Sequence, residues 1–201
     1  MAIKFQYNKT SLQSLNKQLS MRLKVLPVIK NKETALRMEV KNAKYKVKEL
    51  DDKIYQKIQI YTVKPGIWNE FNEKLIAIDD VKTMTKKIAG VKTPVLEEVV
   101  LRAEDFSLFD NPGWFPEGIS IVKELTDIVI EREFFYRKME LLNHARRKTT
   151  QKVNLYEKVQ IPGYEDAIRK IKRFLEDEEN LSKSSQKIVK NRQQQQMEES
   201  Q

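Results

Sequence analysis

The residues of this chain that could support catalysis are few, and their spacing does not suit it. The single histidine, His144, lies in the run HARRK, and cysteine is absent. Disulfides, thiolate metal ligands, cysteine nucleophiles and a histidine-based metal cluster are therefore excluded. We expect His144 to be a solvated or partner-facing side chain on a helix.

Carboxylates occur in adjacent sets rather than in pairs that face one another. The sets are Asp79–Asp80, Glu97–Glu98 and Glu176 to Glu179. Neighbouring side chains on a helix or strand point in different directions, so these residues resemble solubility features more than an acid–base pair. No two of the five glycines form a phosphate-binding loop with a following Lys-Ser/Thr. We therefore expect no catalytic site, no cofactor and no bound metal.

Basic residues form two clusters that suit a negatively charged partner. They are Arg146, Arg147, Lys148 and Lys152 in one cluster, and Lys41, Lys44, Lys46 and Lys48 in the other. A basic coiled coil can bind nucleic acid through its phosphates. The aromatic residues are not interleaved with these clusters, however, and no nucleic-acid-binding motif is present. Ordinary surface charge is favoured over duplex binding, and a place inside an acidic protein cavity stays open.

The charge of the chain is unevenly distributed along its 201 residues, which carry a formal net charge of +9. Residues 1–64 hold 15 basic and 5 acidic residues, residues 65–117 hold 6 and 10, and residues 118–201 hold 17 and 14. Three regions with different surroundings are indicated. No apolar run is long enough to span a membrane, and the opening MAIKFQYNKT lacks the apolar core of a signal peptide. We expect a soluble intracellular protein.

Glycine and proline divide the chain into two arms and an insert. Eight of the eleven Gly and Pro residues lie between Pro65 and Gly118. Because these residues interrupt regular structure, we expect helical arms at about 8–64 and 117–185. The insert covers about 65–116, and a polar tail covers about 186–201. All of these form one domain in this interpretation. The low-complexity composition beyond Ser182 favours a frayed or disordered tail.

An apolar residue recurs every three or four positions along the first arm. The recurring positions are Leu12, Leu15, Leu19, Arg22, Leu26, Ile29, Glu33, Leu36, Val40, Ala43, Val47, Leu50, Ile54, Lys57 and Tyr61. A 3.5-residue repeat of this length places an apolar seam against a partner helix. Arg22, Glu33 and Lys57 interrupt the seam with polar side chains. Pro27 removes one backbone donor, so we expect a kink or break near it.

A second heptad track lies in the other arm and changes phase once. It reads Leu125, Ile128, Arg132, Phe135, Met139, Leu142, Arg146, Thr149, Val153 and Tyr156, then Ile161, Tyr164, Ile168, Ile171 and Leu175. The slip of one residue falls beside Pro162 and Gly163, where a bend or local unwinding would absorb it. Because the insert joins the two arms, we expect the second arm to run back antiparallel to the first. We therefore predict a mainly α fold, a long antiparallel two-helix coiled coil with a small β-hairpin insert.

The insert combines a short helical pattern, two candidate strands and a turn. Residues 67–78 have helical spacing and are interpreted as a continuation of the first arm. Strands are expected at Val81–Ile88 and Val95–Leu101, with bends at Gly90 and Pro94. The run DNPGW, residues 110–114, is a strong turn signal, and the second arm is expected to begin near residue 117. Trp68 and Trp114 are expected to anchor the insert by packing in a core or interface.

Three segments of the chain resemble the D subunit of the V-type/A-type rotary ATPases, and the likeness covers nearly the whole chain. In VLPVIKNKETALRMEV, residues 25–40, the positions of Ile29, Lys30, Lys32 and Leu36 match the family's first-helix stretch. IAGVKTPVL, residues 88–96, is similar to the family's short Gly-Val-x-x-Pro segment. ARRKTTQKVNLYEKVQIPGYEDAIRKIKRFLEDEE, residues 145–179, resembles its second-helix signature.

This resemblance implies a mechanical role. The chain would be a central rotor shaft whose helix ends enter a hexamer of catalytic A and nucleotide-binding B subunits. It would associate with the F subunit, rest on the C subunit of the central stalk, bind no nucleotide and lie in the cytoplasm at the periphery of the membrane. Lys30, Lys32, Arg146 and Arg147 are the candidate partner-facing charges. The candidate coiled-coil seam is Leu36, Val40, Val47, Leu50, Ile54, Leu142, Val153, Ile168 and Ile171.

Two other functions stay open from the residues alone. One is a basic coiled-coil adaptor that binds nucleic acid or an acidic protein surface. The other is a structural tether without a rotary role. Binding to unrelated duplexes with a steep salt dependence would distinguish the adaptor, since phosphate contacts weaken as salt rises.

Overall fold

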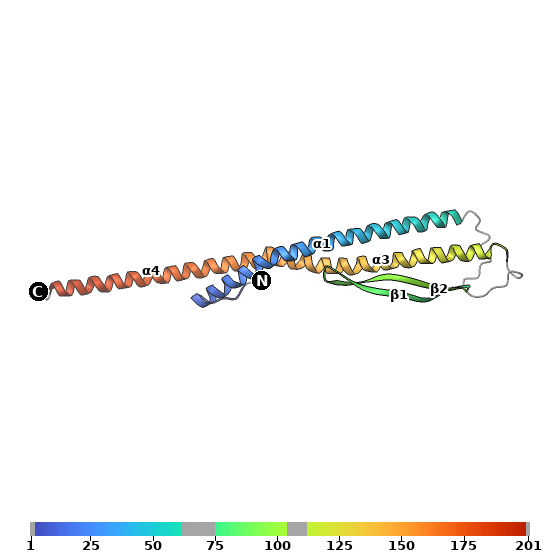
Figure 1. Cartoon of the computed structure of the whole chain (residues 1–201). Coiled ribbons are helices and arrows are strands. Elements are labelled where there is room, and N and C mark those ends of the chain that lie inside the picture. The colour runs from blue at the N-terminus through green and yellow to red at the C-terminus, as the bar shows by residue number, and fades with distance from the viewer. Residues whose placement is uncertain (1–2, 62–74, 104–111, 200–201) are drawn as a thin grey trace. The chain divides into compact units, whose positions relative to one another are not determined.

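The computed structural model of the chain describes residues 3–61, 75–103 and 112–199 (Figure 1). The elements are α1 (Lys9–Tyr61), β1 (Ile76–Ile88), β2 (Val91–Ala103), α3 (Phe115–Leu155), the π-helix η2 (Tyr156–Gln160) and α4 (Ile161–Glu199). These elements form two compact units. The first comprises residues 1–31 and 150–201, and the second comprises residues 32–149.

Helix α1 begins at a side-chain cap and continues through its internal proline. The Oδ1 atom of Asn8 accepts a hydrogen bond from the backbone N–H of Ser11 at 2.6 Å, which satisfies one of the free donors of the first turn. The expected break at Pro27 is wrong, because α1 is helical from Lys9 to Tyr61. Pro27 lies on the exposed side of the helix, so water can hydrogen-bond the carbonyl that loses its donor.

In the first unit, the start of α1 packs against α4. The buried cluster contains Leu15 from α1 and Tyr164, Ala167, Ile168 and Ile171 from α4. Ile3, Phe5, Leu12, Leu19 and Leu175 pack around it. Two polar contacts continue the pairing, from Arg22 to Gln160 and from Lys30 to Glu157. Residue numbers rise along α1 while they fall along its partner, so the two helices are antiparallel.

In the second unit, the remainder of α1 pairs with α3 in the same sense. Ion pairs join Asp51 to Arg132 at 2.9 Å and Lys57 to Glu124 at 2.6 Å. The buried side chains of this pair are Leu36, Ala43, Val47, Leu50, Leu142 and Thr149. Burial of each leucine or valine contributes about 1.5–3 kcal/mol before conformational entropy is subtracted. The predicted mainly α fold of antiparallel helices with a small hairpin is confirmed.

The candidate seam residues differ in how deeply they lie in these helix pairs. Leu36, Leu142 and Ile171 are fully buried, at 0 % exposure. Val47, Leu50 and Ile168 are buried, and Val40, Ile54 and Val153 are half-buried. Of the half-buried members, Val40 and Val153 have smaller side chains than leucine, and Ile54 lies nearer the end of its helix than Leu36 does.

The hairpin is longer than expected, with β1 and β2 paired antiparallel from Ile76–Ala103 to Ile88–Val91. The helical interpretation is wrong for residues 76–78, which are the start of β1 and pair with β2. Leu75, just before β1, is described and buried, and residues 67–74, with Trp68, lie outside the described residues. Pro94 does not mark a bend, because it pairs with Thr85 inside β2. A two-stranded sheet has free outer edges, where a residue without an N–H is tolerated.

The hairpin turn consists of Ala89 and Gly90, whose φ angles are 48° and 80°. Two consecutive positive φ values at a two-residue loop are the type I′ pattern, whose twist matches that of the flanking strands. Glycine adopts this conformation freely, whereas alanine has a Cβ that makes the left-handed region unfavourable. Ala89 is therefore the strained position of the turn.

The second arm begins at a turn and is interrupted once. The N–H of Phe115 donates to the carbonyl of Pro112 at 3.0 Å, which confirms a turn in the described part of DNPGW. Residues 110 and 111 lie outside the described range, and α3 begins at Phe115 rather than near residue 117. The expected local unwinding near Pro162 is confirmed as η2. Its five residues make one wide turn, which accommodates the extra residue between the two tracks.

The C-terminal tail is helical, so the expected frayed or disordered segment is wrong. Helix α4 continues to Glu199, and every residue from 176 to 197 is exposed. No proline or glycine follows Gly163, and Gln, Glu, Lys, Arg and Met have good helix propensities. An ion pair of 2.8 Å between Lys183 and Glu179 adds local support. Local sequence, not packing, therefore carries this part of α4.

A charge introduced into the second unit's helix pair tests the packing. Leu50→Asp should lower the free energy of unfolding by at least about 3 kcal/mol, because it buries an unpaired carboxylate at a position that is 2 % exposed. Gln56→Asp, at an exposed position of the same helix, is the control and should change it by less than about 0.5 kcal/mol. Urea unfolding followed by circular dichroism measures both. Equal losses in the two variants would contradict this packing.

The hairpin turn offers a stabilising substitution. Ala89→Asn should raise the free energy of unfolding by about 0.5–1 kcal/mol, because Asn-Gly is the preferred pair for a type I′ turn. Thr83→Asn, at an exposed strand position, is the control and should not stabilise the protein. Thermal unfolding of the three chains gives the comparison. A loss of stability in Ala89→Asn would show that the turn has another conformation.

Candidate partner interface

The described residues contain little that would support chemistry. Within residues 3–61, 75–103 and 112–199, no group of three or more His, Asp or Glu side chains is placed to hold a metal ion. In the same ranges, no helix has the length and apolar character needed to cross a membrane. His144 is exposed on α3 and lines a shallow groove with Glu140 and Arg147.

Lys30, in the first unit, is engaged within the chain. Its Nζ atom lies 2.8 Å from Oε1 of Glu157 in η2, and both side chains are 46 % exposed. An ion pair with this much solvent contact contributes about 0.2–1 kcal/mol, because water screens the charges. A partner with a carboxylate could therefore replace Glu157 at small cost.

Lys32, in the second unit, lies against the hairpin turn. Its Nζ atom is 3.4 Å from the position that a Cβ atom on Gly90 would occupy. The side chain of Lys32 thus extends from α1 to the turn that connects β1 and β2, and the residue stays exposed. Lys32 links the hairpin tip to α1 besides adding positive charge there.

Arg146 and Arg147 are neighbours on α3 with different surroundings. Arg146 is half-buried, and its Nε and Nη2 atoms donate to Oδ1 of Asn143 at 3.2 and 3.1 Å. Arg147 is exposed and lines the shallow groove with Glu133 and Pro94. Of the two, Arg147 has the geometry of a surface contact, whereas Arg146 is tied to its own helix.

The lysines of the other predicted basic cluster follow α1 in the second unit. Lys41, Lys44 and Lys48 are exposed, whereas Lys46 is half-buried and pairs with Glu49 at 3.1 Å. Tyr45 is 63 % exposed, and the Nζ atom of Lys41 lies 5.6 Å from the centre of its ring. This face therefore presents cations beside an exposed aromatic ring, a combination that suits a protein partner.

A groove between the hairpin and α3 was not anticipated from the sequence. It has a volume of about 500 Å³, and the hairpin lies beside α3 along this stretch (Figure 1). Its lining residues are Glu39, Lys86, Ile88, Pro94, Val95, Leu96, Glu97, Glu131, Phe134, Phe135 and Lys138. Phe134 is the signal that could have revealed it, because this aromatic residue lies off the heptad track and needs a second packing surface.

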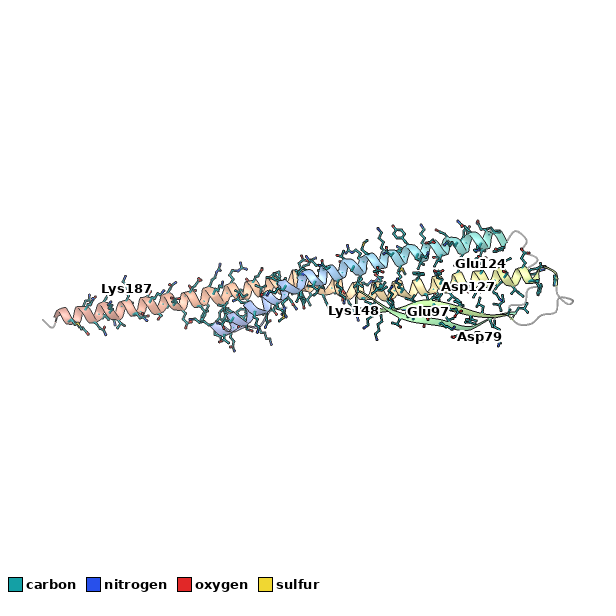
Figure 2. All side chains as sticks on the ribbon, viewed as in Figure 1. Asp79, Glu97, Glu124, Asp127, Lys148 and Lys187 are labelled. Carbon is teal, nitrogen blue, oxygen red and sulfur yellow. The ribbon has the colours of Figure 1, made fainter. Side chains whose placement is uncertain are left out.

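Acidic side chains collect along the same junction of hairpin and helix. Figure 2 labels Glu97 on the hairpin and Asp127 on α3, which line a second shallow groove with Glu98 and Glu131. Glu98 pairs with Lys82 across the hairpin at 2.7 Å. The second unit thus presents a basic face on α1 and an acidic border between β2 and α3.

Several surface carboxylates have a lowered pKa because of a neighbouring lysine. Hydrogen bonds from Lys53 and Lys46 lower the pKa of Glu49. Lys170 lowers the pKa of Asp166 in the same way, again chiefly through a hydrogen bond. The side chains of Glu49 and Asp166 are about half exposed, at 48 % and 47 %, so solvent screens these ion pairs and their effect on stability is small. They mark ordinary helix-surface ion pairs rather than groups prepared for proton transfer.

The fold and these surfaces together define a protein of paired antiparallel helices with charged, exposed faces. A family model that describes the D subunit of ATP synthase matches residues 11–191. The D subunit of the V-type ATP synthase in Chlamydia trachomatis serovar L2 is 28 % identical over 202 residues, with 97 % of this chain and 98 % of that protein covered. The protein of the same description in Borreliella burgdorferi is 31 % identical over 195 residues, with 93 % and 94 % covered.

The chain therefore belongs to the family of ATP synthase D subunits. Members of this family are stalk subunits of the rotary ATPase and are not themselves catalytic. Family membership agrees with paired helices whose described surfaces carry ion pairs and exposed charges.

The lowered carboxylate pKa values predict a pH dependence. A carboxylate with a lowered pKa stabilises the folded chain above its unfolded pKa, and this contribution is lost as pH falls through the folded pKa. The melting temperature should therefore fall from about pH 5 downward. Glu49→Gln and Asp166→Asn together should reduce this fall, whereas Glu165→Gln should not. Thermal unfolding from pH 7 to pH 3 tests this, and an unchanged profile in the double variant would contradict it.

Proposed function

We propose that the chain is the central-stalk rotor shaft of a V-type/A-type ATPase. It transmits torque between ATP hydrolysis or synthesis in a catalytic hexamer and ion translocation in a membrane sector. The observation that carries this proposal is the family match over residues 11–191 on a chain whose arms form antiparallel helix pairs. No observation favours the alternative of an adaptor for nucleic acid or acidic surfaces.

Paired helices suit the transmission of torque for a physical reason. Twisting or bending a helix pair requires interdigitated side chains to move past one another, and cores packed at protein density resist this. The buried side chains Leu36 and Leu142 in one unit, and Leu15 and Ile171 in the other, supply such packing. A shaft that turns inside a ring presents different contacts to each member of the ring in turn, which biases their conformations one after another.

The partners follow from this role. We propose that the chain contacts the A and B subunits of the hexamer, the F subunit, and the C subunit on which the shaft rests. Its place is then the cytoplasm at the periphery of the membrane. The chain itself holds no nucleotide or ion in this proposal, and its contribution is contact and rigidity. Both arms and the insert belong to one rotating domain in this proposal.

Lys30, Lys32, Arg146 and Arg147 are proposed as partner-facing charges. The exposed side chain of Arg147 and the solvent-screened pair of Lys30 support this role most directly. Lys32 supports it through its exposed position beside the hairpin turn. Arg146 has the least support, because it is half-buried and bonded to Asn143.

Co-expression of the tagged full-length chain with the other ATPase subunits tests the function. We expect the chain to co-purify with the A, B and F subunits, and ATP-driven ion transport to require it. A chain that never enters the complex, or a complex that transports ions equally well without it, would overturn the proposal.

Charge reversal tests the interface residues separately. Lys32→Glu with Arg147→Glu should weaken assembly by at least about tenfold, because each replaces an exposed attraction with a repulsion. Lys87→Glu, at an exposed position on β1, is the control for a change of charge alone. Both proteins should melt within about 2 °C of the parent, since surface substitutions have small effects on folding. Equal assembly of the two variants would remove Lys32 and Arg147 from the interface.

A further inference from the structure

Each helix of the pair in the first unit has one backbone irregularity. In α1, Pro27 supplies no N–H, so the carbonyl of Leu23 has no donor four residues later. In the second arm, the N–H of Ile161 donates to the carbonyl of Tyr156, five residues earlier, which closes the wide turn of η2. Both interrupt the regular i→i−4 ladder that makes an α-helix stiff.

The two irregularities lie at the same level of the pair. Arg22 and Lys30 flank Pro27 on α1, and both reach η2. The Nε atom of Arg22 donates to Oε1 of Gln160 at 3.2 Å, and Lys30 pairs with Glu157 at 2.8 Å. We call residues 22–30 together with 156–160 the π-turn level.

The local sequence explains why the second arm widens here. Pro162 follows η2 by two residues and cannot donate to the preceding turn. In a regular α-helix its ring would also clash with the carbonyl of Lys158, and a wider turn relieves that contact. The extra residue between the two heptad tracks supplies the length for this turn. The irregularity is thus a property of the sequence.

No side chain at the π-turn level is buried, although Leu26 and Ile29 are half-buried. No residue of η2 is buried, whereas Ile161 and Tyr164 immediately beyond it are. The half-buried guanidinium of Arg22 lies 6.0 Å from the ring centre of Tyr156 and 5.2 Å from that of Tyr164. At the π-turn level the two helices are thus joined by polar and cation–π contacts, whereas in the buried cluster of the first unit they are joined by apolar side chains. Such contacts constrain the register but oppose small movements less than a close-packed core.

We propose that the π-turn level is a compliant joint, where the helix pair of the first unit bends and twists more readily than in the segments that flank it. Both helical ladders are interrupted there, and little apolar surface must be exposed for either to open. The contacts of Arg22 and Lys30 keep the two helices in register while the backbone bends or twists.

The role of this joint rests on the proposed rotor function. A compliant level in a shaft stores twist when its two ends are loaded unequally and returns it when the load falls. It would smooth the transfer of torque between the place where torque is generated and the place where it is used.

Hydrogen exchange of the isolated full-length chain tests the compliance without reference to the rotary complex. Amides in peptides covering 22–31 and 153–161 should exchange at least about tenfold faster than those in 12–19 and 164–175, which belong to the buried cluster. Equal exchange in the two sets of peptides would overturn the proposal, whatever the function of the chain.

Two variants should stiffen the joint. Deletion of Lys158, an exposed residue of η2, together with Pro162→Ala removes the extra residue and the proline ring that requires the wider turn, and restores the three-and-four spacing between the tracks. Pro27→Ala restores the missing donor in α1. Each should slow exchange at its own side of the joint by at least about tenfold, whereas deletion of Lys187, on the exposed part of α4 labelled in Figure 2, should not. If the chain without Lys158 does not fold, Pro27→Ala alone tests the compliance. Unchanged amide exchange at residues 22–31 of that variant would overturn the proposal.

The assembled ATPase then tests the role in torque transfer. The stiffened variants should enter the complex normally but hydrolyse ATP and transport ions at least about twofold more slowly. Unchanged transport in both variants, with slowed exchange, would overturn the role while the compliance stands. Failure of the parent chain to assemble would instead overturn the rotor function and leave the exchange result intact.

Discussion

The burial of apolar side chains between two antiparallel helices is the constraint on which the rest of the structure depends. An isolated helix of the length of α1, with 53 residues, has no core of its own, and most helical stability in proteins comes from packing of an apolar face. In the first unit Leu15 meets Ile168 and Ile171, and in the second Leu36 and Leu142 are fully buried. The insert between the arms matters because it allows the chain to return.

Polar residues in the helix pairs set the register rather than add much stability. Arg22 bonds Gln160, Arg132 pairs with Asp51 at 2.9 Å and Lys57 pairs with Glu124, so three of the polar residues that interrupt the heptad tracks have partners on the opposite helix. Exposed or half-exposed pairs of this kind contribute about 0.2–1 kcal/mol each. A shifted alignment would leave such charges unpaired while the apolar residues still met, so the polar contacts select one alignment among several.

The periodic features of this fold could be read from the sequence, and the features that depend on tertiary context could not. The change of phase before Ile161 predicted a local unwinding because heptad spacing reports directly on helix geometry. The continuity of α1 at Pro27 depends on which side of the helix meets water, and single-sequence spacing does not settle that. The contacts of Lys30 and Arg146 could not be predicted either, since charged side chains on a helix surface follow no period that identifies their partners.

In each unit a third segment covers part of the helix pair, and in the first unit this cover does not reach the π-turn level. In the second unit the hairpin and α3 line a common groove that includes Phe134. In the first unit the N-terminal segment follows α4, from the contact of Ile3 with Gly163 to the ring of Tyr7, 4.9 Å from that of Phe174. This cover begins three residues beyond the end of η2 and runs away from it. The cover thus reinforces the well-packed side of the joint, so bending strain concentrates where the backbone ladder is already interrupted.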